Sequence, residues 1–285
     1  MDVVRLDGGP FEIEIVPYAG ARFHRLRAHG HDLLRTPDDP RRHREDPFFW
    51  GAYVMAPWCG RSAAGPLTVA GRTVDLAPNF PDGTAIHGQV YGRAWAQVGD
   101  AAFEVEAGGD GWPWRYRVRF EVAIRAAVIA SRLTLTNIDD GLMPAGLGLH
   151  PWFRRPLDAA IRARSVFGSN EQSPTHPSPV AGALDLRDQC PFPTGLDATW
   201  TDLDAPPSVV LSWPAWGMRA DLATSGAFIV AASPPEPDAV AIEPQTHAPN
   251  GLRRTIAGEP GGLTRLAAGA SLGLDVRLAV EISLG

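Results

Sequence analysis

Short apolar runs broken repeatedly by proline and glycine are the feature that most constrains this chain. The 285 residues include 27 Pro and 30 Gly, and between them stand runs of Val, Ile, Leu, Phe and Trp. Phe11–Val16 and Val128–Thr136 alternate apolar with polar residues, which is typical of a strand with one buried face. No long helical periodicity interrupts this rhythm. The sequence therefore predicts an all-β protein with many turns.

The same rhythm runs along the whole chain. No shift in composition marks a linker, and no internal repeat is present. Antiparallel β proteins of about 250 residues often form one domain. We therefore expect a single domain over residues 1–285.

The charged residues exclude several classes of function. All 26 basic residues are arginine, and the net charge is -6. Without lysine, a Schiff-base mechanism or a lysine general base is excluded. The acidic balance and the lack of a dense basic run argue against a nucleic-acid partner. The one basic run, Arg41–Arg44, has acidic neighbours and is predicted to be a solvated loop.

The cellular location is predicted from three features that the sequence does not show: a disulfide framework, a signal peptide and a membrane span. Cys59 and Cys190 are the only cysteines, and two thiols do not make a disulfide framework. The first residues do not resemble a signal peptide, and no segment approaches the roughly 20 apolar residues of a membrane span. We expect a cytoplasmic protein that binds no membrane. The sequence leaves its oligomeric state open.

The segment NIDDGLMPAGLGLHPWF, residues 137–153, combines turn and strand signals. Asn137 to Gly141 supply turn-forming residues. A short strand, Ala145–Leu149, is then predicted to end at His150, because Pro151 removes a ladder donor and favours an extended exit. A histidine there is either an ordinary satisfied side chain or part of a pocket floor. The second interpretation requires other polar residues of the chain to lie near His150.

Three further polar residues stand where apolar segments end. A second apolar strand is predicted to end at Glu243, again before a proline. An aromatic run leads to Arg61, whose guanidinium needs either an internal carboxylate or a ligand oxygen. His87 precedes a glycine, as at a loop rim where backbone approaches a ligand. We expect these three residues and His150 to converge in one solvent-accessible cleft.

Other residues could also suggest a site. Three histidines within residues 24–31 lack a regular ligand spacing and fit an exposed hairpin better than a metal centre. Trp112, Trp114 and Tyr116 alternate and so share one face of a strand. They could form a stacking platform for a sugar, but aromatic residues at strand spacing favour a core position.

Two of these segments resemble a known family. Residues 137–153 resemble the N-x-x-D-x-x-M-P-x-x-x-G-x-HP-aromatic-F run of the aldose 1-epimerase (galactose mutarotase) family, and AIEPQTHAPNG, residues 241–251, is similar to its E-P-x-T-x-x-P-N/D stretch. Arg61 and His87 stand in the matching order, and the resemblance extends from about Phe11 to Glu281. It implies a large antiparallel β-sandwich of the galactose mutarotase-like type with an open carbohydrate cleft.

The resemblance also implies roles. Glu243 would be the base that removes the proton from the anomeric hydroxyl, and His150 the acid that protonates the ring oxygen. Arg61 and His87 would bind sugar hydroxyls. Asp197, in the segment LDATW, matches the acidic residue that holds ring hydroxyls less closely.

The residue types suit this chemistry in their own right. Opening a hemiacetal takes a proton from O1 and gives one to O5, and a carboxylate with an imidazole can do both near neutral pH. The chain has no convincing signature for a nucleophile, a cofactor or a metal. The predicted reaction is therefore the interconversion of α and β anomers of a free aldohexose, with the sugar as the only partner expected.

Three alternatives remain open. The same fold could act on a hexose 6-phosphate, with Arg93, Arg154 and Arg155 holding the phosphate. It could be a carbohydrate-binding domain without turnover, since a fold alone does not establish a function. Residues His87, His150, Glu243 and His247 could instead hold zinc, although the acid–base interpretation explains the same residues better.

Overall fold

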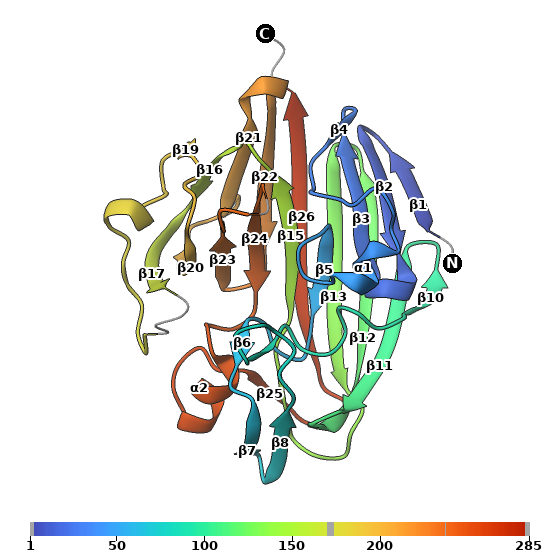
Figure 1. The fold of residues 1–285 in the computed structure, drawn as a ribbon, viewed down its shortest axis with the longest axis vertical. Helices are drawn as coiled ribbons and strands as arrows, with labels where there is room; N and C mark the ends of the chain where they lie inside the picture. Colours follow the sequence, from blue (N-terminus) through green and yellow to red (C-terminus); the bar gives the residue numbers. More distant parts are fainter. Residues whose placement is uncertain (1–2, 170–173, 237, 283–285) are drawn as a thin grey trace.

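The computed structural model describes residues 3–169, 174–236 and 238–282. Two large antiparallel sheets dominate this part of the chain (Figure 1). In spatial order the larger sheet contains β1 (Val4–Gly8), β2 (Phe11–Val16), β3 (Arg22–Ala28), β5 (Ala52–Met55), β15 (Gly148–Arg154), β24 (Ala239–Gln245), β23 (Phe228–Ala232), β20 (Asp197–Leu203), β17 (Ala163–Ser169) and β18 (Ser178–Pro179), with β4 (His31–Asp32) paired to β3.

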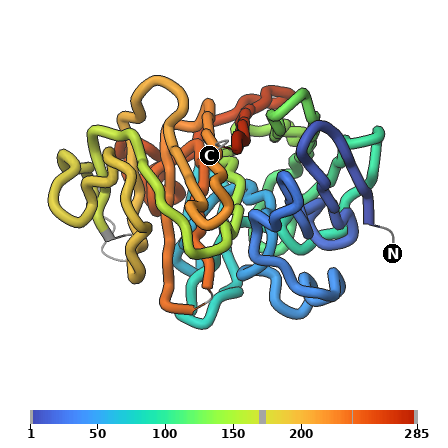
Figure 2. Tube along the Cα trace, turned by 90° about the horizontal axis from the view of Figure 1, so that it is seen from above, coloured from blue at the N-terminus to red at the C-terminus, as the bar shows by residue number. Residues whose placement is uncertain are grey.

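The second sheet is formed by strands from the middle and the end of the chain. In spatial order these are β10 (Ala96–Gly99), β11 (Ala102–Gly109), β12 (Trp112–Arg125), β13 (Val128–Asn137), β26 (Ser271–Ile282), β22 (Met218–Thr224), β21 (Val209–Trp213), β16 (Asp158–Ile161) and β19 (Cys190–Pro191). In Figure 2 the N-terminal strands and the yellow segment around β18 lie at opposite sides of the molecule, as the two edges of the larger sheet require.

Smaller elements complete the described part of the chain. Three strand pairs stand apart from the large sheets: β14 (Met143–Ala145) with β25 (Thr264–Leu266), β6 (Arg61–Ser62) with β9 (Ala85–Ile86), and β7 (Gly65–Val69) with β8 (Arg72–Leu76). The helices are α1 (Arg42–Glu45), α2 (Gly251–Ala257) and the 3₁₀ turns η1 (Pro17–Ala19), η2 (Gly182–Leu184) and η3 (Pro214–Trp216). None of the helices within the described ranges is long and apolar enough to cross a bilayer. The prediction of an all-β, antiparallel fold is confirmed.

The core lies between the two sheets. Phe23 of β3 packs edge-on against Phe120 of β12, with ring centroids 5.6 Å apart. Alternate residues of β12 point into this layer, including Trp112, Trp114 and Tyr116, each at most 1% exposed. Their alternation therefore marks a core face of a strand, and a sugar-stacking platform is ruled out at this position.

One predicted loop is instead a helix over a buried side chain. Arg42–Glu45 forms α1, and His43 within it is fully buried, whereas the sequence predicted a solvated loop. The His43 ring lies 3.3 Å from Nη1 of Arg22 and 2.9 Å from Nδ1 of His24, nitrogen to nitrogen. His24, expected on an exposed hairpin, is only 2% exposed. The predictions failed because these polar groups find their partners in one another rather than in water.

Two predicted strand ends are also wrong. His150 lies within β15, which continues to Arg154, and Glu243 lies within β24, which continues to Gln245. In an antiparallel ladder each residue directs its N–H towards only one neighbouring strand. A proline therefore removes one bond without ending the strand.

Candidate functional site

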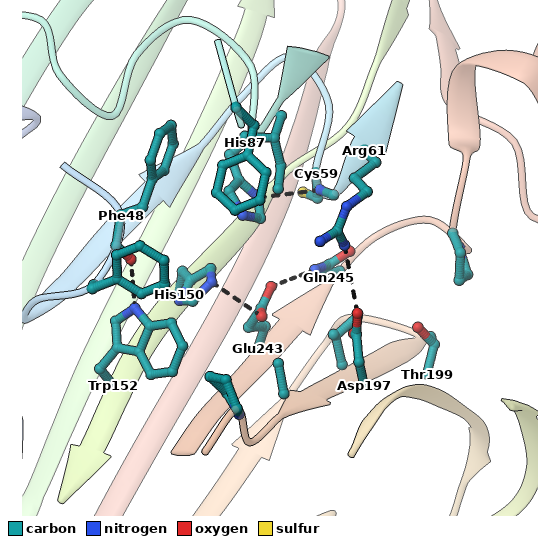
Figure 3. A pocket seen from close by; sticks show the side chains of 18 of the residues that line it. Phe48, Cys59, Arg61, His87, His150, Trp152, Asp197, Thr199, Glu243 and Gln245 are labelled. Carbon is teal, nitrogen blue, oxygen red and sulfur yellow. Dashed lines mark hydrogen bonds and ion pairs between the residues drawn. The ribbon is translucent and has the colours of Figure 1, made fainter. Parts of the chain in front are cut away.

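The outer face of the larger sheet carries a cavity of about 430 Å³. Its floor comes from β5, β15, β24, β23 and β20, and loops rise around it. All five residues that the sequence singled out line this cavity: Arg61, His87, His150, Asp197 and Glu243. Figure 3 shows His150 and Glu243 pointing towards each other, with Trp152 on one side and Arg61 and Asp197 on the other. The roles of these residues stay predictions.

His150 and Glu243 form a cross-strand pair. The backbone register aligns Gly148 with Gln245 and Trp152 with Ala241, which sets His150 directly opposite Glu243. Nε2 of His150 lies 3.2 Å from Oε1 of Glu243. A proton can therefore pass between the two side chains without any movement of the sheet.

The backbone register explains the close approach, and two prolines remove the hydrogen-bond donors on either side of the pair. Thr246 N–H bonds to the Leu147 carbonyl across the β15–β24 seam, so Pro244, two residues earlier, faces the same seam without a donor. Trp152 N–H bonds to the loop before β5, so the preceding Pro151 faces β24 and also lacks a donor. Regular pairing is missing between them. His150 and Glu243 occupy the intervening non-hydrogen-bonded pair, where Cα atoms are only about 4.5 Å apart.

Burial shifts both pKa values of this pair. Glu243 is 3% exposed, and burial raises its pKa well above the usual value, helped by the charge of Asp197. His150 is 4% exposed, and burial lowers its pKa well below the usual value, helped by neighbouring His87. Both shifts favour a protonated carboxyl beside a neutral imidazole. Arg61 lowers the pKa of Glu243, but burial has the larger effect.

The hydrogen bond from Gln245 holds the carboxyl in place. Nε2 of Gln245 donates to Oε2 of Glu243 at 2.8 Å, while Oε1 faces His150. This bond favours the ionised form and lowers the pKa of Glu243. It also fixes which carboxyl oxygen is directed to the imidazole.

His87 is held as a neutral donor. Its Nδ1 accepts the Gly60 N–H at 3.2 Å, so the ring proton belongs on Nε2. Burial lowers its pKa to about 3. The residue has φ of 62°, and a Cβ on Gly88 behind it would lie 1.9 Å from the Ala56 carbonyl oxygen. The glycine after the histidine is therefore required by the tight turn.

Arg61 meets two carboxylates at the other end of the cavity. Its Nε donates to Asp82 Oδ2 at 2.7 Å, and its Nη1 to Asp197 Oδ2 at 3.5 Å. About a third of each of the Arg61 and Asp197 side chains stays exposed, at 32% and 33%. The sequence left open an internal salt bridge or a ligand contact, and this arrangement permits both.

Sequence reasoning missed several lining residues. Gln245, Trp152 and Thr199 each lie two positions after a predicted site residue, and all three line the cavity. Side chains two apart in a strand share a face. The strand period was the signal that could have found them. Phe48 and Phe49 also line the cavity but come from the loop before β5, where no period applies.

The three arginines of the phosphate alternative, and one histidine of the zinc alternative, lie outside the cavity lining. Arg93, Arg154 and Arg155 are not among the lining residues, and each donates to backbone carbonyl oxygens. His247 is also outside the cavity lining, with Nδ1 bonded to the next carbonyl and Nε2 accepting the Cys59 N–H. Within the described ranges, no group of three or more His, Cys, Asp or Glu side chains is arranged to hold a metal ion. Whether activity needs a metal stays a prediction.

Comparisons with known proteins identify relatives over the whole chain. The family model described as aldose 1-epimerase matches residues 2–278. A search of curated proteins gives no match. Among solved structures, a galactose mutarotase-like protein from Clostridium acetobutylicum aligns with a TM-score of 0.85 and 16% identity, covering 98% of this chain and 95% of that one.

Two further solved structures share the fold. An aldose epimerase homologue from C. elegans aligns with a TM-score of 0.83 and 14% identity, covering 99% of each chain. The galactose 1-epimerase from Lactobacillus acidophilus NCFM aligns with a TM-score of 0.79 and 16% identity, covering 99% of this chain and 95% of that one. At these identities the structures show a common fold.

Proposed function

Because the chain belongs to the aldose 1-epimerase family, we propose that it interconverts the α and β anomers of a free aldohexose. The observation that carries this proposal is the His150–Glu243 pair, 3.2 Å apart and facing a cavity. Two proton-transfer groups so close together can serve two adjacent oxygen atoms of one ligand. A hemiacetal presents two such atoms, O1 and O5, on the same carbon.

The reaction needs one proton shared by this pair. Glu243 takes the proton from the O1 hydroxyl, the C1–O5 bond breaks as the C1=O1 bond forms, and His150 gives its proton to O5. Rotation about C1–C2 then presents the other face of the aldehyde. O5 attacks C1, His150 recovers the proton from O5, and Glu243 returns its proton to O1. Atoms and charges balance, and the enzyme ends as it began.

The reactive protonation state follows from the contacts. Burial raises the pKa of Glu243 and lowers that of His150, and both shifts favour placing the shared proton on the carboxyl. Transfer across the 3.2 Å contact gives the carboxylate and imidazolium that start ring opening. The Gln245 N–H and the charge of Arg61 both favour that carboxylate. The pair titrates as a unit, so its apparent pKa values belong to both groups.

The other lining residues supply hydroxyl contacts. His87 offers its Nε2–H, since Nδ1 is occupied by the Gly60 N–H. Arg61 and Asp197 stand together at the polar end of the cavity, each about one-third exposed. Donor and acceptor side by side suit the vicinal hydroxyls of a sugar ring. We assign these three residues to substrate binding.

A free sugar fits the cavity better than a phosphorylated one. Among the described residues that line the cavity, Arg61 is the one arginine, and two carboxylates already neutralise its charge. The three arginines considered for phosphate bind backbone carbonyls outside the cavity. A phosphate dianion would therefore meet no uncompensated positive charge there.

Polarimetry tests the proposal. Freshly dissolved α-D-galactose and α-D-glucose should lose their excess rotation faster in proportion to enzyme concentration, and proton NMR should show faster exchange between the two anomeric signals. The Glu243→Gln variant serves as the matched control and should leave only the spontaneous rate. If the wild-type protein binds sugars but accelerates mutarotation of none, it is a carbohydrate-binding domain and the proposal is wrong.

A further inference from the structure

The cavity floor has two parallel rows of side chains. Backbone pairing aligns His150, Glu243, Val230 and Thr199 across four adjacent strands. The next row on the same face aligns Trp152, Ala241, Ala232 and Asp197. Neighbouring strands are about 4.8 Å apart, so Trp152 and Asp197 arise roughly 14 Å from each other. The small side chains between them leave a space that fits one pyranose ring.

The two ends of this space differ in chemistry. At the β15 end the Trp152 ring lies 5.8 Å from Phe49 and 5.1 Å from His150, centroid to centroid. Phe49 and Phe48 are half-buried and line the cavity. At the β20 end stand Asp197 and Thr199, joined by Arg61. The acid–base pair therefore lies between an aromatic end and a polar end (Figure 3).

The order of the two catalytic groups orients the sugar. His150 stands on the aromatic side of Glu243, because β15 precedes β24 in the sheet. With His150 serving O5 and Glu243 serving O1, the ring continues past O5 to C5 and C6 towards the aromatic end. In the other direction C2 and C3 carry their hydroxyls towards Asp197 and Arg61. A sugar in this position has its C6 substituent against Trp152 and Phe49.

The aromatic end offers little to a polar C6 group. The Trp152 indole N–H is already donated to the Phe48 carbonyl at 2.6 Å. The hydroxyl of Tyr53, which also lines the cavity, makes no hydrogen bond within the described residues, but its oxygen has almost no exposed surface to offer a C6 group. A methyl group suits this environment, and a hydroxyl would lose water without a partner. A phosphate would lose still more, because Arg61, the one arginine in the described lining, stands at the opposite end.

We infer that the preferred substrates are 6-deoxyaldohexoses, whose C6 methyl group packs on Trp152 and Phe49. This inference rests on the proposed function, because it uses the assignment of Glu243 to O1 and His150 to O5. A hydrophobic pocket rejects an added hydroxyl only moderately, by about 100-fold at most. We therefore expect a 6-deoxy sugar to be preferred moderately over the corresponding hexose. A hexose 6-phosphate should not be a substrate.

Matched sugar pairs test the inference. D-Fucose differs from D-galactose only in lacking the 6-hydroxyl, and D-quinovose differs from D-glucose in the same way. We expect kcat/KM for mutarotation, measured by NMR exchange, to be about 10-fold or more higher for each deoxy sugar. Galactose 6-phosphate should not be accelerated. A ratio of one or below in both pairs overturns the inference, even if mutarotation is fast.

Two variants distinguish a loss of C6 recognition from a general loss of activity. Phe49→Ser should reduce the D-fucose to D-galactose ratio towards one, mainly by weakening D-fucose. Phe80→Ser changes an equally half-buried lining phenylalanine beside Arg61, and should slow both sugars alike and keep the ratio. If both variants change the ratio equally, or neither changes it, Phe49 does not contact C6.

Binding measurements distinguish this inference from the proposed function. Calorimetric titration of the wild-type protein with D-fucose and D-galactose reports affinity without turnover. Tighter D-fucose binding without any acceleration of mutarotation would refute the proposed function and keep the C6 contact. Fast turnover with tighter D-galactose binding would keep the function and overturn the contact.

Discussion

Two clusters of buried ionisable side chains both contact Tyr53. The pocket cluster comprises His87, His150 and Glu243. The closed cluster comprises Arg22, His24 and His43. The Tyr53 ring stacks on His150, with centroids 4.5 Å apart, and the Arg22 guanidinium carbon lies 4.9 Å from the centroid of the same ring.

Burial and pKa do not distinguish the clusters. Every member is at most 6% exposed. Burial lowers the pKa of His43 to about 2 and that of His87 to about 3. A search for perturbed titratable groups would therefore select both clusters equally.

Access and bonding distinguish them. Arg22 donates to four backbone carbonyls, of Ala19, Pro47, Trp50 and Tyr91, at 2.8 to 3.5 Å. No member of the closed cluster is among the described residues that line the cavity. The pocket cluster keeps polar atoms directed at a space that a ligand can enter. A buried histidine is thus a candidate for catalysis only where one of its ring nitrogen atoms faces a cavity that a ligand can enter. The closed cluster is expected to stabilise the fold and to have no part in catalysis.

The largest effect is expected from Glu243→Gln. The amide keeps the shape of the side chain but cannot accept the O1 proton, and general acid–base groups contribute about 10²–10⁴-fold. We expect kcat for mutarotation to fall by that factor, with sugar affinity and melting temperature little changed. Polarimetry, calorimetric titration and thermal unfolding measure the three quantities. A Glu243→Gln variant with wild-type kcat would show that Glu243 is not the base. The pocket cluster would then have no demonstrated function that distinguishes it from the closed cluster.

Arg22→Met should give the opposite result. The change leaves several buried carbonyl oxygens and the His43 ring without their donor, and we expect the free energy of unfolding to fall by about 3 kcal/mol. Because Arg22 does not line the cavity, kcat of the folded fraction should stay within a few-fold of wild type. Urea unfolding and polarimetry below the new midpoint measure the two effects. A large loss of kcat with unchanged stability would place Arg22 functionally with the pocket cluster.

Arg61→Gln tests the polar end of the cavity. A hydrogen bond from a charged group to a ligand is worth about 1.5–3 kcal/mol, so KM should rise roughly 10- to 100-fold. The change in kcat should be small, since Arg61 contacts the ground state and the transition state alike. Asp82→Asn, which alters a partner of Arg61 outside the cavity lining, is the matched control and should raise KM less. Equal effects would mean that Arg61 acts through its salt bridges alone.

His43→Gln should change how stability depends on pH. In the unfolded chain His43 takes up a proton below pH 6.5 or so, but in the folded protein its pKa is about 2. The unfolded state binds more protons between these values, so stability falls as pH falls, by about 1.4 kcal/mol per pH unit for this one residue. The variant lacks this dependence and should lose less stability between pH 6 and pH 4. An unchanged slope in urea titrations would show that His43 is not held neutral.

The fold was largely predictable because strand signals are local. Alternation alone gave Phe11–Val16 as it is observed, and Val128–Thr136 within one residue of β13. The closed cluster was missed for a physical reason. His43 and His24 are 19 residues apart and look exposed in their own segments, and only folding brings their nitrogen atoms to 2.9 Å.

The candidate site was predictable in its members and not in its geometry. Pro151 and Pro244 indicated strand ends, yet both strands continue through them. Their missing donors face one shared seam, and that coincidence depends on a register which no local pattern encodes. The strand period from Glu243 to Gln245 was present in the sequence all along.

The smallest effect is expected from Gln245→Met, and it concerns the pH profile. Activity requires one proton on the His150–Glu243 pair, so the alkaline limb marks loss of that proton, and the acid limb marks gain of a second one. The Gln245 N–H, 2.8 Å from Oε2, lowers the pKa of Glu243 against the rise caused by burial. Without it that pKa rises further, and the alkaline limb should move to higher pH.

The same change should lower kcat about five-fold, since the carboxylate that starts ring opening loses one hydrogen bond worth about 1 kcal/mol. Thr199→Val is the matched control, because Thr199 lines the same row of the floor but lies two strands from Glu243. It should affect KM without shifting either limb. If Gln245→Met lowers kcat while the alkaline limb stays fixed or moves to lower pH, Gln245 only supports the packing around Glu243 and does not tune its proton affinity. Gln245 would then have a structural role only, like the hydrogen bonds of the closed cluster.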